Sequence, residues 1–102
     1  LNTQQQDLEI QKENFLFNQN FFTIRNNEEL DKLQQLIQKD EELIVLRQSI
    51  KKASLAQLEN GVINTSDYLR EVNAEEQARI QKMTHEIQFL FTQYNQKAQL
   101  NN

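Results

Sequence analysis

The sequence contains no cysteine, no proline, no tryptophan and only one glycine, Gly61. Without cysteine the chain forms no disulfide and no thiolate metal site, which leaves its compartment open, because oxidising compartments also hold cysteine-free proteins. Without proline, and with a single glycine, almost nothing along the chain interrupts a helix. Because strand-like alternation is also nearly absent, the sequence predicts an all-α fold.

Positive charge and long apolar runs are scarce as well. The 11 Lys and Arg residues are outnumbered by 15 Asp and Glu residues, the net charge is -4, and the isoelectric point is about 5.0. The basic residues are scattered along the chain, so a nucleic-acid surface is not expected. No run of about 20 apolar residues predicts a membrane helix, and no basic-then-apolar leader is present. Because the chain starts on Leu1 instead of Met, we expect it to be a fragment of a longer protein.

Only 37% of the 102 residues are apolar, and the mean hydropathy is -0.81. This composition favours an elongated object with a narrow seam over a compact core. We therefore predict a single long antiparallel helical hairpin over residues 1–102, with a first arm at 1–59, a turn at 60–65 and a second arm at 66–100. Asn60 and Gly61 can end the first helix, because glycine takes a left-handed backbone without strain, and the side-chain oxygens of residues 64–67 can cap the second.

Apolar residues in the first 24 positions recur at seven-residue steps, which is typical of a coiled-coil seam. The two parallel rows are Leu1, Leu8, Phe15 and Phe22, and Ile10, Phe17 and Ile24. In a hairpin centred on Gly61 the second arm ends roughly opposite Ile24, so these rows have no partner within the chain. They could be covered by folding back at Asn26-Asn27 or by another copy of the chain, and we expect a homo-oligomer.

The pair Asn26-Asn27 is the weak point of the first arm. Asn26 and Glu29 resemble a capping box, so a helix could restart here and divide the chain into three helices. Each asparagine costs only about half a kcal/mol inside a helix, and no glycine or proline is nearby. One continuous helix is therefore the favoured prediction.

Each arm carries a row at alternating three- and four-residue steps. These rows are Leu33, Leu36, Asp40, Leu43, Arg47 and Ile50 in the first arm, and Leu69, Val72, Glu76, Ile80, Met83, Ile87, Leu90 and Tyr94 in the second. Facing residues should have numbers that total about 123, which predicts the pairs Leu33–Leu90, Leu36–Ile87 and Leu43–Ile80. The same register places Asp40 beside Met83 and Arg47 near Glu76.

Candidate catalytic or metal-binding groups are few. His85 is the only histidine, its neighbours form no ligand set, and we expect it at the solvent side or at the edge of the seam. The adjacent glutamates 28–29, 41–42 and 75–76 point about 100° apart on a helix and are expected on solvated faces. The sequence predicts no enzyme, no cofactor and no metal site.

One stretch resembles a known family. Residues 56–69, continuing through 73–78 and 85–88, are similar to the outer-membrane efflux proteins of the TolC family, with the Asn- and Gln-rich character of members from Bacteroidetes-type bacteria. In that family a periplasmic tip has a glycine, a leucine eight residues later and an alanine about nine residues after that. Gly61, Leu69 and Ala78 occupy these positions. The family often has an Asp-Ala pair after the leucine, where this chain has Arg70 and Glu71, and Asp67 could supply the acidic charge instead.

The resemblance implies a trimer whose long helices form a periplasmic tunnel in the bacterial cell envelope, opened at its tips by an adaptor protein and an inner-membrane pump. The outer membrane would be crossed only by parts of the full-length protein outside this chain. The residues expected to meet the adaptor are Asn60, Gly61, Val62, Ile63, Asn64, Ser66, Asp67 and Arg70. The alternative is a general coiled-coil interaction or scaffold domain with no role in transport.

Overall fold

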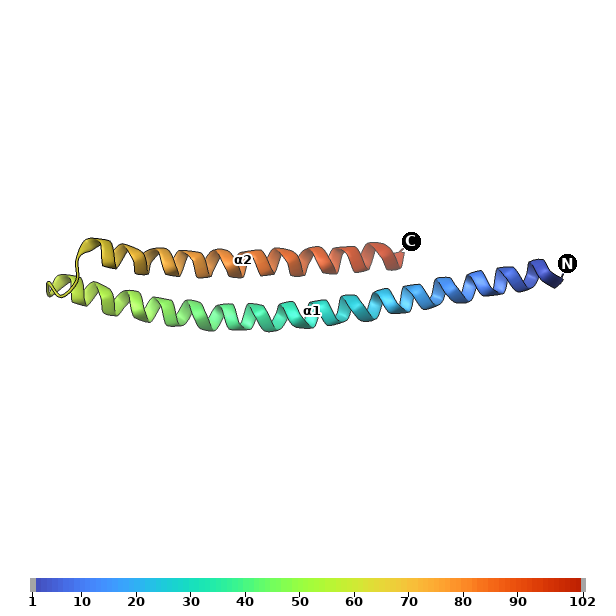
Figure 1. Cartoon of the computed structure of the whole chain (residues 1–102), viewed down its shortest axis with the longest axis horizontal. Helices are drawn as coiled ribbons and strands as arrows, with labels where there is room; N and C mark the ends of the chain where they lie inside the picture. Colours follow the sequence, from blue (N-terminus) through green and yellow to red (C-terminus); the bar gives the residue numbers. More distant parts are fainter. Residues whose placement is uncertain (1, 102) are drawn as a thin grey trace.

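The fold is a long antiparallel helical hairpin, as predicted (Figure 1). The computed structural model describes the backbone of residues 2–101 and the side chains of residues 3–99, so Leu1 of the first heptad row lies outside the described residues. Helix α1 spans Asn2–Glu59 and helix α2 spans Thr65–Asn101. The hairpin measures 88 × 16 × 15 Å. Its length is that of α1 alone, because 58 residues rising 1.5 Å each extend about 87 Å.

Helix α1 runs without a break through Asn26 and Asn27, so the three-helix alternative is wrong. The small helix penalty of two asparagines does not outweigh the hydrogen bonds of the helical turns on either side. Asn27 also contacts the second helix, because its Oδ1 accepts a hydrogen bond of 3.3 Å from Nε2 of Gln96.

The end of α1 is a left-handed cap at the only glycine. Gly61 has a φ of 73°, which other residues adopt only with strain. Its N–H donates to the carbonyl of Leu58 at 3.1 Å, and the N–H of Val62 donates to the carbonyl of Gln57 at 2.8 Å. This pair of bonds is a Schellman motif, which satisfies carbonyls that the end of a helix leaves unpaired. The predicted role of Gly61 is confirmed.

A reciprocal cap starts α2. Oδ1 of Asn64 accepts a hydrogen bond of 2.8 Å from the N–H of Asp67, and Oδ2 of Asp67 accepts one of 3.3 Å from the N–H of Asn64. The arrangement is that of a capping box, with an acidic residue in the first turn, where the helix dipole favours negative charge. Residues 60–63, which lie between the end of α1 and the capping residue Asn64, are therefore enough to reverse the chain.

The interface between α1 and α2 is narrow and half polar. Its buried apolar residues are Leu33, Ile44 and Ala78, and its buried polar residues are Asp40, Ser54 and Glu75. A seam of this composition buries little hydrocarbon, so charge pairing contributes to the choice of which faces meet.

The axial register agrees with the prediction, but the rotation of α2 does not. Glu41 meets Lys82 and Asp40 meets His85, so facing residue numbers total 123 and 125. However, Ile80, Ile87 and Leu90 are exposed. The predicted apolar pairs Leu33–Leu90, Leu36–Ile87 and Leu43–Ile80 are therefore wrong.

The predicted neighbours of the two charged seam residues are corrected in the same way. Asp40 contacts His85 instead of Met83, and Arg47 contacts Glu71 instead of Glu76. The physical reason is that the α1 seam carries charges, and α2 turns toward it the face with complementary charges. The apolar row of α2 is left on the opposite side.

The N-terminal part of α1 extends beyond the end of α2 (Figure 1). Phe15, Phe17 and Phe21 are exposed here. The rings of Phe17 and Phe21 stack with centroids 6.4 Å apart, and the guanidinium of Arg25 lies 5.6 Å from the Phe21 centroid. These contacts lie within α1 itself. Phe22, the last residue of its heptad row, is half-buried and lines a hollow with Phe15 and with Gln99 near the end of α2, so the rows leave the second helix at this point.

Candidate functional site

The tip of the hairpin presents most of the residues predicted to meet a partner. Those exposed to solvent are Asn60, Gly61, Val62, Asn64, Ser66 and Arg70, and those half-buried are Ile63 and Asp67. A Cβ built on Gly61 would meet no atom within 4 Å, so the glycine is required by its backbone angle and not by crowding. The tip is a small convex surface held rigid by its two caps.

The charges at the tip are not equivalent. Asp67 is engaged in the capping box, whereas the side chain of Arg70 is 80% exposed and lies 3.9 Å from Asp67. An exposed pair at this distance is weak. Arg70 is therefore the charge at the tip that is available to a partner, and Asp67 is a structural residue.

Four groups of charged residues join the two helices, and we call them the ionic row. They are Asp40 with His85, Glu41 with Lys82, Arg47 with Glu71, and Lys51 with Glu75 and Arg79. The Lys51–Glu75 pair is short, at 2.5 Å between Nζ and Oε2, and the Arg47–Glu71 pair is long, at 4.0 Å. The row runs along the middle of the seam and toward the tip.

Glu75 is a buried member of the ionic row with two cationic partners. It is buried, and it accepts hydrogen bonds from Lys51 and, at 3.1 Å, from Arg79. The hydrogen bond from Lys51 holds the pKa of the Glu75 carboxyl below its ordinary value of 4.5, although desolvation opposes this. The same bond raises the pKa of Lys51 above 10.5. The expectation that residues 75–76 form a solvated pair is wrong for Glu75, while Glu76 is exposed.

His85 lies at the edge of the seam, one of its two expected positions. Its side chain is 16% exposed, and its Nδ1 lies 2.5 Å from Oδ2 of Asp40. The sequence reading did not predict this partner. A second row of α2 could have indicated this contact, because it recurs at three- and four-residue steps and four of its five side chains can carry a charge. The row is Glu71, Glu75, Ala78, Lys82 and His85.

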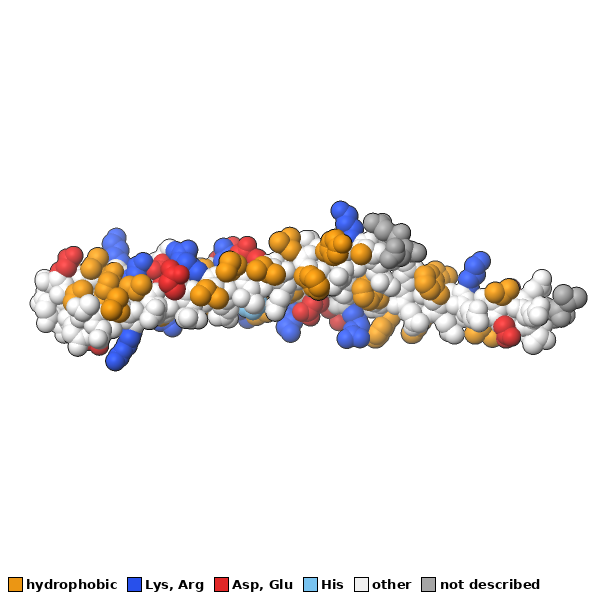
Figure 2. All heavy atoms as spheres, turned by 90° about the horizontal axis from the view of Figure 1, so that it is seen from above, with side chains coloured by type: hydrophobic (Ala, Val, Ile, Leu, Met, Phe, Trp, Pro, Cys, Tyr) orange, Lys and Arg blue, Asp and Glu red, His pale blue; other side chains and the backbone are white. Residues whose placement is uncertain are grey.

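A second surface lies on the side of α2 that points away from α1, and we call it the outer face of α2. Its apolar members are Leu69, Ile80, Met83, Ile87, Leu90 and Tyr94, which are 47–70% exposed. Ile87 follows the buried Ala78 by nine residues, which at 100° per residue places it about 180° around the helix. Figure 2, which views the molecule from the side of α2, shows hydrophobic side chains along its length. Helix α2 therefore has one face that packs on α1 and, on the opposite side, an exposed apolar face.

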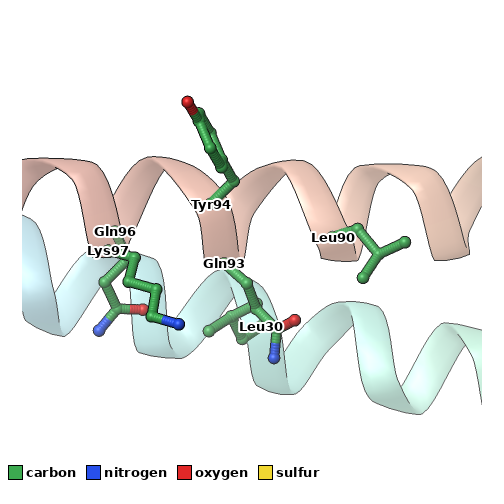
Figure 3. A pocket seen from close by; sticks show the side chains of 6 residues that line it. All are labelled: Leu30, Leu90, Gln93, Tyr94, Gln96 and Lys97. Atoms are coloured by element: carbon green, nitrogen blue, oxygen red, sulfur yellow. The ribbon is translucent and has the colours of Figure 1, made fainter.

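Near the open end of the hairpin the outer face borders a shallow hollow (Figure 3). The hollow is lined by Leu30, Leu90, Gln93, Tyr94, Gln96 and Lys97. Tyr94 points away from α1, and Leu30 lies between the two helices. Its walls are amides, aliphatic groups and one lysine, which suits packing against another helix better than chemistry on a small molecule.

Within residues 2–101 no helix is long and apolar enough to cross a membrane, and no group of three or more His, Cys, Asp or Glu side chains could hold a metal ion. Comparison with known protein families, with curated proteins and with solved structures finds no match for the chain.

Proposed function

We propose that the chain is a wall segment of a trimeric outer-membrane export channel in the bacterial cell envelope, similar to the TolC family. The hairpin would stand in the periplasm, with the turn at Gly61 directed toward an adaptor protein and its inner-membrane pump. The outer membrane would be reached only through parts of the full-length protein outside this chain.

The observation that carries the proposal is the exposed apolar face of α2, on the side opposite to the face that packs on α1. In a wall of helices standing side by side, an inner helix packs against a neighbour on each side. Within this chain α2 contacts α1 through the ionic row, and the apolar outer face remains for the second neighbour. An apolar stripe of this length on a solvent-facing helix is a mark of an interaction surface.

The tip supports the second part of the proposal. It is narrow, and hydrogen-bonded caps close both helices there. It lies at the opposite end of the hairpin from the two termini, and it offers Arg70 to an acidic group of the adaptor. Reversing a charge at a contact of this kind puts like charges together, which costs several kcal/mol.

The experiment is Arg70→Glu in the full-length protein, expressed in cells that lack their own copy. We expect capture by the adaptor to fall about tenfold or more and the export substrate to accumulate in the cells. The matched control is Lys39→Glu, which makes the same charge change at an exposed position of α1 distant from the tip. Equal adaptor capture and equal export by both variants and the unsubstituted protein would refute the role of the tip.

A general coiled-coil scaffold is the second candidate, favoured by the heptad rows in the N-terminal part of α1. It predicts an assembly held by those rows and no export defect in cells lacking the protein. A trimer in sedimentation equilibrium together with an export defect on deletion favours the channel.

A further inference from the structure

Two charged residues interrupt the outer face of α2. Its residues recur at alternating four- and three-residue steps, and they are Leu69, Asn73, Glu76, Ile80, Met83, Ile87, Leu90, Tyr94 and Lys97. Glu76 and Lys97 are exposed, and neither forms an ion pair with another side chain of residues 3–99. A row of this kind is the seam of a two-stranded coiled coil, in which a second helix covers the apolar positions. The two charges then decide which helix fits and in which direction.

A second copy of the chain in parallel orientation is opposed by these charges. In a parallel pair each residue of the row faces its own counterpart. Glu76 would then meet Glu76 of the second copy, and Lys97 would meet Lys97. Like charges brought together across an interface weaken it.

An antiparallel second copy fits the apolar part of the row. With the two-fold axis level with position 85, Ile80 of one copy packs against Leu90 of the other, and Met83 packs against Ile87. Because the pair is two-fold symmetric, each of these contacts occurs twice. All four side chains are exposed in the single hairpin, so the pair removes hydrocarbon from water on both copies.

The charged residues select this register. Glu76 comes to lie beside Tyr94 of the second copy, which points away from α1 (Figure 3) and can donate its hydroxyl proton to the carboxylate. Lys97 of the second copy is about one helical turn further on, within reach of the same carboxylate. A shift of seven residues in either direction would bring Glu76 against Ile87 or Lys97 against Ile80, which places a charge against hydrocarbon.

We propose that two copies of the chain pair through the outer faces of α2, antiparallel and centred on position 85, with Glu76 of each copy beside Tyr94 and Lys97 of the other. The two α1 helices lie on the outside of the pair, because each outer face is opposite to the face that packs on α1. The pair is a form of the hairpin by itself. It does not depend on the proposed export channel, in whose wall all tips point the same way.

One like-charge contact gives the antiparallel pair a signature. Glu86 lies at the edge of the row and close to the axis, so its two copies approach each other, although each keeps Lys82 of its own helix at 3.9 Å. Glu86→Gln should therefore lower the dissociation constant of the pair roughly twofold or more. The matched control is Glu42→Gln at an exposed position of α1, which should have no comparable effect. Equal effects of the two substitutions would argue against the pairing.

Cross-linking measures the direction of the pair, because the chain has no cysteine of its own. Chains with Ile80→Cys and chains with Leu90→Cys, one of them isotope-labelled, are mixed in equal amounts, left to exchange partners and treated with a short bismaleimide. In the antiparallel pair residues 80 and 90 of different copies are neighbours, whereas two copies of residue 80 are about 15 Å apart along the axis. We expect the 80–90 product to exceed the two homodimeric products together by about fivefold or more, whereas unspecific coupling gives equal amounts.

Charge reversal is the second test, measured as the dissociation constant by sedimentation equilibrium, with circular dichroism as the check on folding. Glu76→Lys and Lys97→Glu should each raise the constant about fivefold or more, and the double variant should bring it back near its starting value. Three results would overturn the proposal. They are a chain that stays monomeric at all concentrations, homodimeric cross-links in excess of the 80–90 product, and a double variant that associates as weakly as the single ones.

Discussion

The outer face of α2 gives the sharpest prediction, tested by replacing two of its apolar residues with serine. The double variant Ile87→Ser with Leu90→Ser removes hydrocarbon from the centre of the face without adding charge. Both side chains are largely exposed, at 60% and 63%. The hairpin should therefore keep its helical content, and only its association should weaken.

The expected magnitude follows from the exposed area. Complete burial of an isoleucine or leucine side chain stabilises by about 1.5–3 kcal/mol, and about three-fifths of each of these side chains still faces solvent. If association buries that remainder, the two residues together contribute about 2–3.5 kcal/mol per copy. This corresponds to an increase in the dissociation constant of roughly 30- to 300-fold.

The assay is sedimentation equilibrium over a wide range of protein concentration, with circular dichroism as the check on folding. The matched control is Val45→Ser with Leu46→Ser on α1, where the two side chains are 62% and 55% exposed. We expect the control to associate as the unsubstituted chain does. The reasoning is refuted if the α2 variant associates with unchanged affinity, or if both double variants weaken association equally.

Three further predictions concern the turn and the ionic row. Gly61→Ala should lower the thermal midpoint by roughly 5–10 °C, because a left-handed backbone costs about 1–2 kcal/mol in a residue with a Cβ. Gly61→Asn should lower the midpoint less. Equal midpoints for the alanine variant and the unsubstituted chain would contradict the strain argument. Asn64→Ala should cost about 1 kcal/mol through the lost cap, measured by urea unfolding, whereas Asn64→Ser should retain most of the stability. Lys51→Gln should move acid unfolding to higher pH. The pKa of Glu75 lies below 4.5 because Lys51 donates to it, so the stability from this pair is present above pH 4.5 and is lost as the pH falls through the lowered value; an unchanged acid midpoint would argue against that contact.

The turn could be predicted residue by residue, because its determinants are local. Gly61 supplies the positive φ, and Asn64 and Asp67 are three residues apart, which is the spacing a capping box requires. The lengths of the helices were predictable for the same reason, since the sequence has few residues that stop a helix.

The rotation of α2 could not be predicted from periodicity alone. Periodicity identifies the rows of a helix, but it does not say which neighbour each row meets. If the most apolar row of α2 is taken as the seam, the seam contains Ile80, Ile87 and Leu90, but in this chain these residues are exposed. Charge complementarity with the α1 seam would have selected the row of Glu75 and His85 instead. A helix that carries both a charged row and an apolar row requires both criteria.

If the outer face of α2 is covered in the native assembly, thiol labelling will show it directly. Because the chain has no cysteine, Ile87→Cys and Val45→Cys each introduce a single reactive thiol. The measurement is the rate of maleimide labelling in the assembled native protein, relative to the same variant in urea. We expect the thiol at position 87 to label at least about tenfold more slowly in the native protein and the thiol at position 45 to label at nearly the unfolded rate. Equal, rapid labelling at both positions would contradict it.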